Sequence, residues 1–293
     1  MDLKLYGKAA YSSVDAADGS MLLSGRILPG MPDSQDTDTA KPWSGRLIFW
    51  GGGSAWVGRA KAETGFHGHH AIQVTLALEG GDVRLRAEGG DWSAYPAAIV
   101  AANQLHAFEA NGNLVALIFI EPESRAGRAL RERYRQGIAP LAAEALAGAA
   151  GRLAALYWQR AAVGELAECA REVAAQLADP GLPPARVMDK RIEAAIGVLR
   201  QRLDGAVAMA DIAAAVNLSP ERFRHLFLQE TGVRFRAYVL WLRMEVANAA
   251  HAAGSSLTEA SHAGGFADSA HFSRTFKRMF GVPAVDVRRG TQT

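Results

Sequence analysis

The stretch FHGHHAIQ (66–73) holds three of the chain's eight histidines. An imidazole nitrogen can bind a divalent metal, form a hydrogen bond with an organic ligand, or only fill space inside a domain. In an extended chain alternate residues share a face, so His67, His69 and Gln73 lie on one polar side while His70 joins an apolar side. The spacing predicts a small set of polar side chains on one face and leaves their role open.

The part of the chain that positions these histidines is predicted to be rich in β-strands. Up to about Pro122, short β-type runs are separated by glycine-rich turns, which is typical of a sandwich or a small barrel. The runs are LIFW (47–50), AIQVTLAL (71–78), VRLRAE (83–88) and LVALIFI (114–120). Trp50, Trp56 and Trp92 could line an apolar pocket there, but core packing is the favoured interpretation for each.

From Ser124 to Ala178 the pattern is helical and rich in alanine. An apolar stripe at three- and four-residue steps consists of Leu166, Ala170, Val173 and Leu177. Cys169, the only cysteine, lies beside this stripe as an apolar filler; it excludes an intramolecular disulfide and is consistent with a reducing compartment. Residues 179–184, Asp-Pro-Gly-Leu-Pro-Pro, end the helical pattern and indicate a linker.

Charge is unevenly distributed along the chain. Residues 186–293 carry 15 Lys and Arg against 10 Asp and Glu, whereas residues 1–185 carry 17 against 20. A basic C-terminal third suggests a polyanion such as nucleic acid as partner. The sequence has neither the apolar run of a membrane helix nor the pattern of a signal peptide, so we expect a cytoplasmic protein.

The basic third contains a repeated unit. Phe223-Arg-His-Leu-Phe227 returns as Phe272-Ser-Arg-Thr-Phe276, and Gly232-Val233 returns as Gly281-Val282, each 49 residues later. A repeat at a fixed offset indicates one supersecondary unit that occurs twice.

Each copy is predicted to be a helix-turn-helix. In the first, a short helix over 211–216 precedes a turn, Ser219 caps the next helix and Pro220 takes its first position. In the second, the unit runs from Leu257 to Phe280 with Asp268 or Ser269 as cap. The side chains predicted to face DNA are Glu221, Arg222, Arg224 and His225 in the first copy, and Ser269, His271, Ser273, Arg274, Lys277 and Arg278 in the second.

The remaining positions of the two second helices are predicted to face the core. They are Phe223, Leu226, Phe227 and Glu230 in the first copy, and Phe272, Phe276 and either Met279 or Phe280 in the second. One long helix over 237–253 would fix the separation of the copies, so that the two helices enter major-groove segments about 34 Å apart.

Residues 189–289 resemble the DNA-binding domain of the AraC/XylS family of bacterial transcription regulators. The matching stretches are DIAAAVNLSPERFRHLF, ETGVRFRAYVLWLRMEVA and GGFADSAHFSRTFKRMFGV. The resemblance implies that the base-facing residues are Glu221, Arg224 and His225 in the first copy, and Ser269, Ala270, His271, Ser273 and Arg274 in the second. The chain departs from the family pattern at Ala260-Ser261-His262 and at Pro283, so we expect the second copy to pack and read DNA less strictly.

In this family the N-terminal domain is often a cupin-like β-barrel followed by dimerising helices, and residues 1–178 resemble that order. The resemblance implies a homodimer that binds double-stranded promoter DNA and senses a small-molecule effector. Candidates for the dimer interface are Leu153, Leu156, Tyr157 and the stripe from Leu166 to Leu177, with core packing within one chain as the alternative.

The cupin resemblance also bears on the histidines. Metal-binding cupins use His-x-His, a Glu four residues later and a late His, which correspond here to His67, His69, Gln73 and His106. Three imidazoles and one amide are able to hold Zn²⁺, Ni²⁺ or Fe²⁺, although a neutral Gln weakens the site. A metal-free effector pocket and inert histidines are the alternatives.

The prediction is an α+β multidomain protein: a cupin-like effector-sensing barrel (1–122), a helical dimerisation segment and linker (123–182) and a DNA-binding domain with two helix-turn-helix motifs (186–293). We expect a regulator and no enzyme activity. The alternatives are a metal-sensing regulator and a metal-dependent cupin oxygenase or isomerase fused to a DNA-binding domain.

Overall fold

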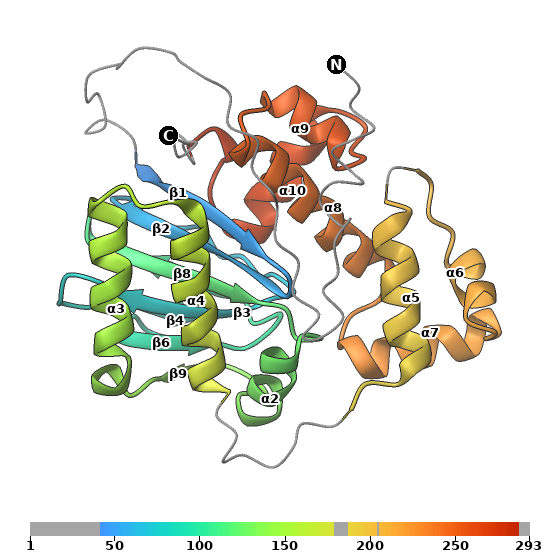
Figure 1. Cartoon of the computed structure of the whole chain (residues 1–293), viewed down its shortest axis with the longest axis horizontal. Helices are drawn as coiled ribbons and strands as arrows, with labels where there is room; N and C mark the ends of the chain where they lie inside the picture. The colour runs from blue at the N-terminus through green and yellow to red at the C-terminus, as the bar shows by residue number, and fades with distance from the viewer. Residues whose placement is uncertain (1–41, 179–186, 204, 287–293) are drawn as a thin grey trace.

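The computed structural model describes residues 42–178, 187–203 and 205–286 (Figure 1). The predicted linker at 179–184 and the outer ends of the first and third predicted domains lie outside the described residues.

The N-terminal domain is rich in β-strands, as the sequence predicts, and its described residues form two antiparallel sheets. The larger has the strand order β1 (Trp43–Trp50), β2 (Gly53–Ala60), β8 (Leu114–Ile120), β3 (Ile72–Ala77), β6 (Ala97–Val100) and β9 (Ile138–Pro140). The smaller has the order β5 (Ser93–Tyr95), β4 (Val83–Ala87) and β7 (His106–Glu109). This arrangement is compatible with a cupin-like barrel.

The strand that follows the histidines begins later than the alternation argument assumes. Regular β3 starts at Ile72, and residues 68–71 form no strand. A single bridge joins the backbones of His67 and His106, with N–O distances of 3.0 and 2.9 Å. The histidines therefore lie in a loop that this bridge fixes to the start of β7.

Three helices follow the strands: α2 (Arg125–Arg133), α3 (Ala143–Trp158) and α4 (Val163–Leu177). The pattern between Ser124 and Ala178 is helical, as predicted, except at Ile138–Pro140, where β9 pairs with β6 at the edge of the sheet. Three residues are too few to show a strand periodicity in the sequence, so pairing with an existing edge decides their conformation.

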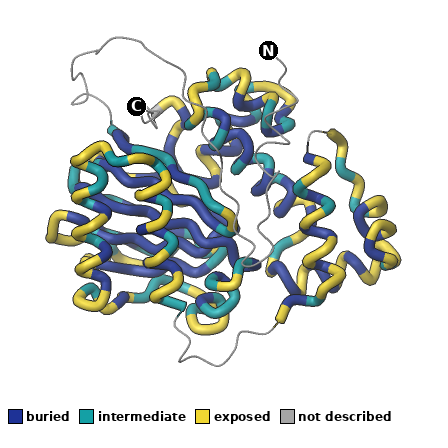
Figure 2. Tube along the Cα trace, viewed as in Figure 1, coloured by how far each residue is buried: buried dark blue, intermediate teal, exposed yellow. Residues whose placement is uncertain are grey.

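Helices α3 and α4 cover one face of the six-stranded sheet (Figure 1), and the strands beneath them are buried (Figure 2). Leu153 and Leu166 are fully buried against this face, as are Ala170 and Val173. Core packing within one chain is therefore the interpretation that the structure supports, and these four side chains are not available for the predicted dimer interface. Cys169 is buried in the same cluster, as predicted.

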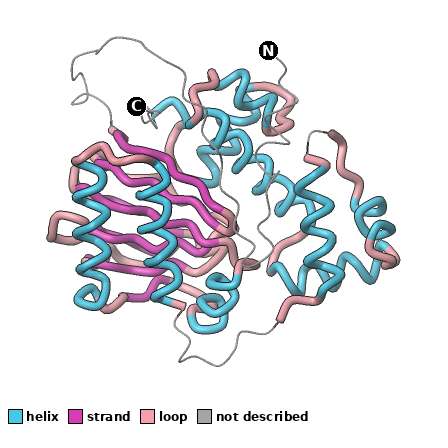
Figure 3. The backbone as a smooth tube through the Cα atoms, in the orientation of Figure 1, coloured by secondary structure: helices cyan, strands magenta, loops and turns pink. Residues whose placement is uncertain are grey.

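Helices make up the C-terminal domain (Figure 3). They are α5 (Lys190–Gln201), α6 (Met209–Ala215), α7 (Pro220–Thr231), α8 (Phe235–Ala252), α9 (Leu257–Ala263) and α10 (Ser269–Phe280), with the short 3₁₀ turn η1 (Ala284–Asp286). The predicted long helix is α8, which at 18 residues is about 27 Å long.

The two motifs have equivalent helix ends. Ser219 caps α7 by accepting a hydrogen bond from Arg222 N, and Asp268 caps α10 by accepting one from His271 N. Gly232 and Gly281 end these helices in the left-handed conformation, with φ of 78° and 74°, which glycine adopts without steric cost. The 49-residue repeat therefore marks the same turn in both motifs.

A single apolar cluster crosses from one domain to the other. Trp43, Trp56 and Phe119 on the inner side of the sheet belong to the same cluster as Phe272 and Phe276 of α10. The domains are also joined by polar contacts: Arg200 of α5 forms an ion pair with Glu121 at 2.7 Å, and Arg131 of α2 donates to the Glu230 carbonyl at 2.6 Å. In the described part of the chain, helices fall short of the length and apolar character needed to cross a membrane.

Candidate functional site

The outer face of α7 holds the polar residues that the sequence predicts for DNA contact. Glu221, Arg222, Arg224 and His225 are exposed, whereas Phe223, Leu226, Phe227 and Glu230 are buried. Glu221 Oε1 lies 2.7 Å from Arg224 Nη2 and 2.7 Å from His225 Nε2. Hydrogen bonds from Arg224 and then His225 lower the pKa of the Glu221 carboxyl. One carboxylate therefore orders two potential base-reading side chains on an exposed surface.

The outer face of α10 is more basic. Arg274, Lys277 and Arg278 are exposed, and Ser269, His271 and Ser273 are half-buried. The ring of His271 packs edge-on against Phe266, 5.3 Å between centroids. Phe272, Phe276 and Met279 are buried, as predicted for the inner face, and Phe280 is half-buried.

A second group of candidate site residues lies inside the N-terminal domain. His67, His69 and His106 are buried. Three ring nitrogens, one from each histidine, all lie within 4.8 Å of one another. The bridge between His67 and His106 brings the first and last of these residues together across 39 positions of sequence. The structure thus places side by side the three histidines that the sequence suggested as ligands.

The backbone fixes the tautomer of His67 and His106. The Nδ1 atoms of His67, His69 and His106 lie 2.9, 2.8 and 2.9 Å from the carbonyl oxygens of Gly65, Ala71 and Gln104. Because a carbonyl only accepts, Nδ1 carries the proton in His67 and His106, and their Nε2 atoms keep a lone pair. His69 Nε2 faces a second acceptor, Gln73 Oε1, at 3.0 Å, so its neutral ring has one N–H for two oxygens.

Burial keeps these rings neutral. Loss of solvation lowers the pKa of His67 to about 3, with the neighbouring His69 as the next cause, and lowers the pKa of His69 and His106 as well. Neutral imidazoles with free lone pairs are hydrogen-bond acceptors or metal ligands.

His70 is separate from the other three histidines, as the alternation argument predicts, but it does not join an aliphatic face. Its Nε2 lies 2.6 Å from Glu123 Oε1, and both side chains are buried. Its ring also contacts Tyr238 and Trp241 of α8, with centroids 5.2 and 6.1 Å away. His70 is therefore part of the contact between the domains.

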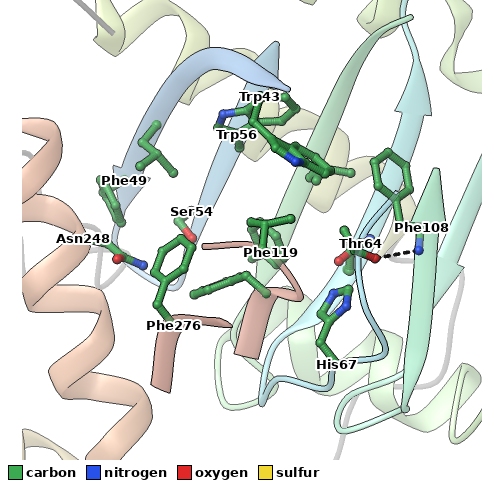
Figure 4. A pocket seen from close by; sticks show the side chains of 15 residues that line it. Trp43, Phe49, Ser54, Trp56, Thr64, His67, Phe108, Phe119, Asn248 and Phe276 are labelled. Atoms are coloured by element: carbon green, nitrogen blue, oxygen red, sulfur yellow. Dashed lines mark hydrogen bonds between the residues drawn. The ribbon is translucent and has the colours of Figure 1, made fainter. Parts of the chain in front are cut away.

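Beside the histidines is a pocket lined by both domains (Figure 4). The β-rich domain contributes Trp43, Leu47, Phe49, Ser54, Trp56, Thr64, His67, Gln73, Phe108, Leu117 and Phe119, and the helical domain contributes Asn248, Phe276, Phe280 and Val282. Thr64 Oγ1 accepts a hydrogen bond from Phe108 N at 2.8 Å, which orients one of the polar groups of the wall. The described lining contains no Lys, Arg, Asp or Glu.

The sequence identified only part of this pocket. Trp56 both lines the pocket and belongs to the buried core, the interpretation that the sequence favoured. Trp50 packs near the opposite apolar cluster, and Trp92 lies beside the guanidinium groups of Arg84 and Arg86. Trp43 and the four residues of the helical domain were missed. Nothing in the local pattern shows that α8 and α10 form one wall of the pocket, because that depends on how the domains dock.

Comparison with known proteins agrees with this geometry. Residues 212–290 match the family model of a helix-turn-helix domain. The uncharacterized HTH-type transcriptional regulator YidL of Escherichia coli K12 is 34% identical over 103 residues, 35% of this chain and 35% of YidL. The transcriptional activator RhrA of Rhizobium meliloti 1021 is 32% identical over 89 residues, 29% of this chain and 28% of RhrA. The chain thus matches about a third of the length of these curated relatives.

The fold of the whole chain also has a solved counterpart. The crystal structure of ToxT from Vibrio cholerae O395 has a TM-score of 0.53 and covers 78% of this chain and 94% of its own, at 14% identity. This likeness shows a shared two-domain architecture.

Fold and site together define a two-domain protein in which a β-rich domain precedes a helical domain with two helix-turn-helix motifs. That helical domain is similar to the helix-turn-helix domains of bacterial transcription regulators. The matched relatives are regulators, which agrees with the prediction of a regulator and not with that of an enzyme.

Proposed function

We propose that this protein binds promoter DNA with the outer faces of α7 and α10, and that a small-molecule effector bound between its domains changes that binding. The observation that carries the proposal is the pocket itself. Its wall includes Phe276 and Phe280 of α10, the helix whose opposite face carries Arg274 and Lys277. A ligand in the pocket would contact the core side of the same helix that meets DNA.

The lining indicates the chemical class of the effector. Aromatic and aliphatic side chains dominate, and the polar groups are the neutral Ser54, Thr64, His67, Gln73 and Asn248. A largely apolar or aromatic molecule with one or two hydrogen-bonding groups suits such a wall, because a buried charge without a partner is costly.

DNA binding is tested by fluorescence anisotropy of a labelled fragment from the region upstream of the protein's own gene. We expect Arg224→Ala and Arg274→Ala each to weaken binding roughly tenfold, because a good contact between arginine and a base contributes about 1–3 kcal/mol. Arg152→Ala is the control, since Arg152 is an exposed arginine on α3, paired with Glu172. Equal affinities for all four proteins would contradict the proposal.

The effector is tested by a thermal-shift screen of apolar acids, aromatics and sugars, since a ligand that binds only the folded chain raises its melting temperature. A hit is assigned to the pocket if Asn248→Leu or Phe276→Leu abolishes the shift. A shift that both variants retain would place the effector elsewhere.

We also propose that the regulator acts as a homodimer, because two chains with two motifs each match direct or inverted half-sites. Light scattering at micromolar concentration, with and without DNA, measures this directly. A monomer under both conditions would contradict it.

A further inference from the structure

The histidine cluster contains hydrogen-bond acceptors that lack donors. His106 Nε2 is buried and has no hydrogen-bond partner among the described residues. Since its Nδ1 donates to the Gln104 carbonyl, this Nε2 presents a lone pair to the protein interior. A buried acceptor left unpaired costs about 1–3 kcal/mol.

A second conflict lies next to it. His69 Nε2 is 3.0 Å from Gln73 Oε1, while His69 Nδ1 is 2.8 Å from Ala71 O, so both ring nitrogens face oxygens that only accept. The Gln73 amide nitrogen donates to Thr75 Oγ1 at 3.0 Å, which directs Oε1 toward the imidazole. A neutral imidazole has one N–H for these two oxygens, so one of the contacts lacks a proton. A cation shared between His69 Nε2 and Gln73 Oε1 would satisfy this arrangement, with the proton on Nδ1.

We propose that His67, His69 and His106 bind one divalent transition-metal ion through their Nε2 atoms, with Gln73 Oε1 as a further ligand, and that the ion regulates the position of α10. Three neutral imidazoles with an oxygen donor suit Zn²⁺, Co²⁺ or Ni²⁺. Each ring also has the backbone carbonyl partner on Nδ1 that metal-binding histidines generally have. The regulatory half of this inference rests on the proposed function.

Two hydrogen bonds to the backbone of Gly65 connect the histidine cluster to the end of α10. Gly65 O accepts from His67 Nδ1 at 2.9 Å, and Gly65 N donates to Gly281 O, at the end of α10, at 3.0 Å. The ring of His69 also lies 6.2 Å from that of Phe280, between centroids. A shift of His67 toward an ion would therefore act on the end of α10 through a single loop.

Metal binding is measured on the full chain purified without a histidine tag. The protein is loaded separately with Zn²⁺, Co²⁺ or Ni²⁺, passed through a desalting column and analysed for elements, and the visible spectrum of the Co²⁺ form is recorded. We expect about one ion per chain for at least one of the metals. A wild-type protein that retains no stoichiometric ion of any of the three would overturn the proposal.

Two variants locate the ion. His106→Gln should lower affinity at least about tenfold, whereas His262→Gln, which removes an exposed histidine of α9, should bind like the wild type. Equal binding by these two variants would overturn the assignment. Circular dichroism confirms that each is folded.

A gain-of-function variant covers the case in which His106→Gln fails to fold. Gln73→Glu adds an anionic ligand, so it should bind the ion more tightly than the wild type and show a larger metal-dependent rise in melting temperature. A smaller rise than in the wild type would contradict Gln73 as a ligand.

The regulatory half is tested by the affinity for the upstream DNA with and without the ion. We expect a change of about fivefold or more in the wild type and none in His106→Gln. A fully loaded protein whose DNA affinity is unchanged would overturn the regulation and leave the metal site. A protein that binds the ion but no DNA in either state would instead overturn the proposed function.

Discussion

Gly65 donates its backbone N–H to the carbonyl oxygen of Gly281, and this 3.0 Å bond joins the β-rich domain to the end of α10. The approach is close enough that an added Cβ on Gly281 would lie 2.5 Å from Gly65 O and 2.6 Å from His67 Nδ1. Glycine is required here both for its φ of 74° and for the space that it leaves.

The close approach predicts that Gly281→Ala destabilises the protein more than Gly232→Ala. Both glycines end a helix in the left-handed conformation, so both substitutions cost about 1–2 kcal/mol of backbone strain. Near Gly232 an added Cβ meets only the guanidinium group of Arg131, at 3.5 Å. Overpacking at Gly281 should therefore add about 1–3 kcal/mol to the loss of unfolding free energy in urea. Equal losses of unfolding free energy in the two variants would show that the close contact between Gly65 and Gly281 does not affect stability.

Lys277→Ala is expected to weaken DNA binding uniformly. Lys277 is exposed in the last turn of α10, beyond the residues predicted to face bases, so it suits a phosphate contact. Removal of one phosphate contact lowers the slope of log affinity against log salt by about one. The measurement is the affinity for specific and unrelated DNA over a range of salt. A loss confined to the specific sequence, with an unchanged slope, would mean that Lys277 reads bases.

Glu245 of α8 is expected to make stability fall as pH rises. Burial, and then the charge of Glu121, raises the pKa of the Glu245 carboxyl well above its usual value of 4.5. Between the unfolded and folded pKa the native state binds more protons than the unfolded chain, so the free energy of unfolding decreases as pH increases.

Glu245→Gln removes this penalty. Its advantage in unfolding free energy over the wild type should therefore be larger at pH 8 than at pH 5, by up to about 1.4 kcal/mol for each unit of pKa shift. Glu193→Gln, at an exposed position of α5, is the control for loss of a carboxylate. An advantage of the same size at both pH values would contradict the shift.

The helical domain was predictable from the sequence because its signals are local. Ser219 and Asp268 cap helices, Gly232 and Gly281 end them, and Phe223 and its repeat Phe272 recur 49 residues apart. Each of these signals lies within one or two helical turns of the residue that it positions. The sequence therefore predicts the order and approximate bounds of α6 to α10.

The sensor pocket was less predictable because it depends on contacts between distant segments. The sequence suggested His67, His69, Gln73 and His106 as a set, and the structure brings them together. It gave no sign that α10 forms a wall beside them or that His70 pairs with Glu123. Those contacts follow from docking of the two domains, which leaves no periodic pattern in either one.

The central claim is that both motifs read DNA as parts of one rigid body, and a footprint on the upstream DNA tests it most directly. We expect two protected major-groove segments for each bound chain, separated by roughly one helical turn, about 10.5 base pairs. Arg224→Ala should weaken protection of one segment and Arg274→Ala that of the other. A single protected segment that Arg224→Ala and Arg274→Ala leave unchanged would contradict the account.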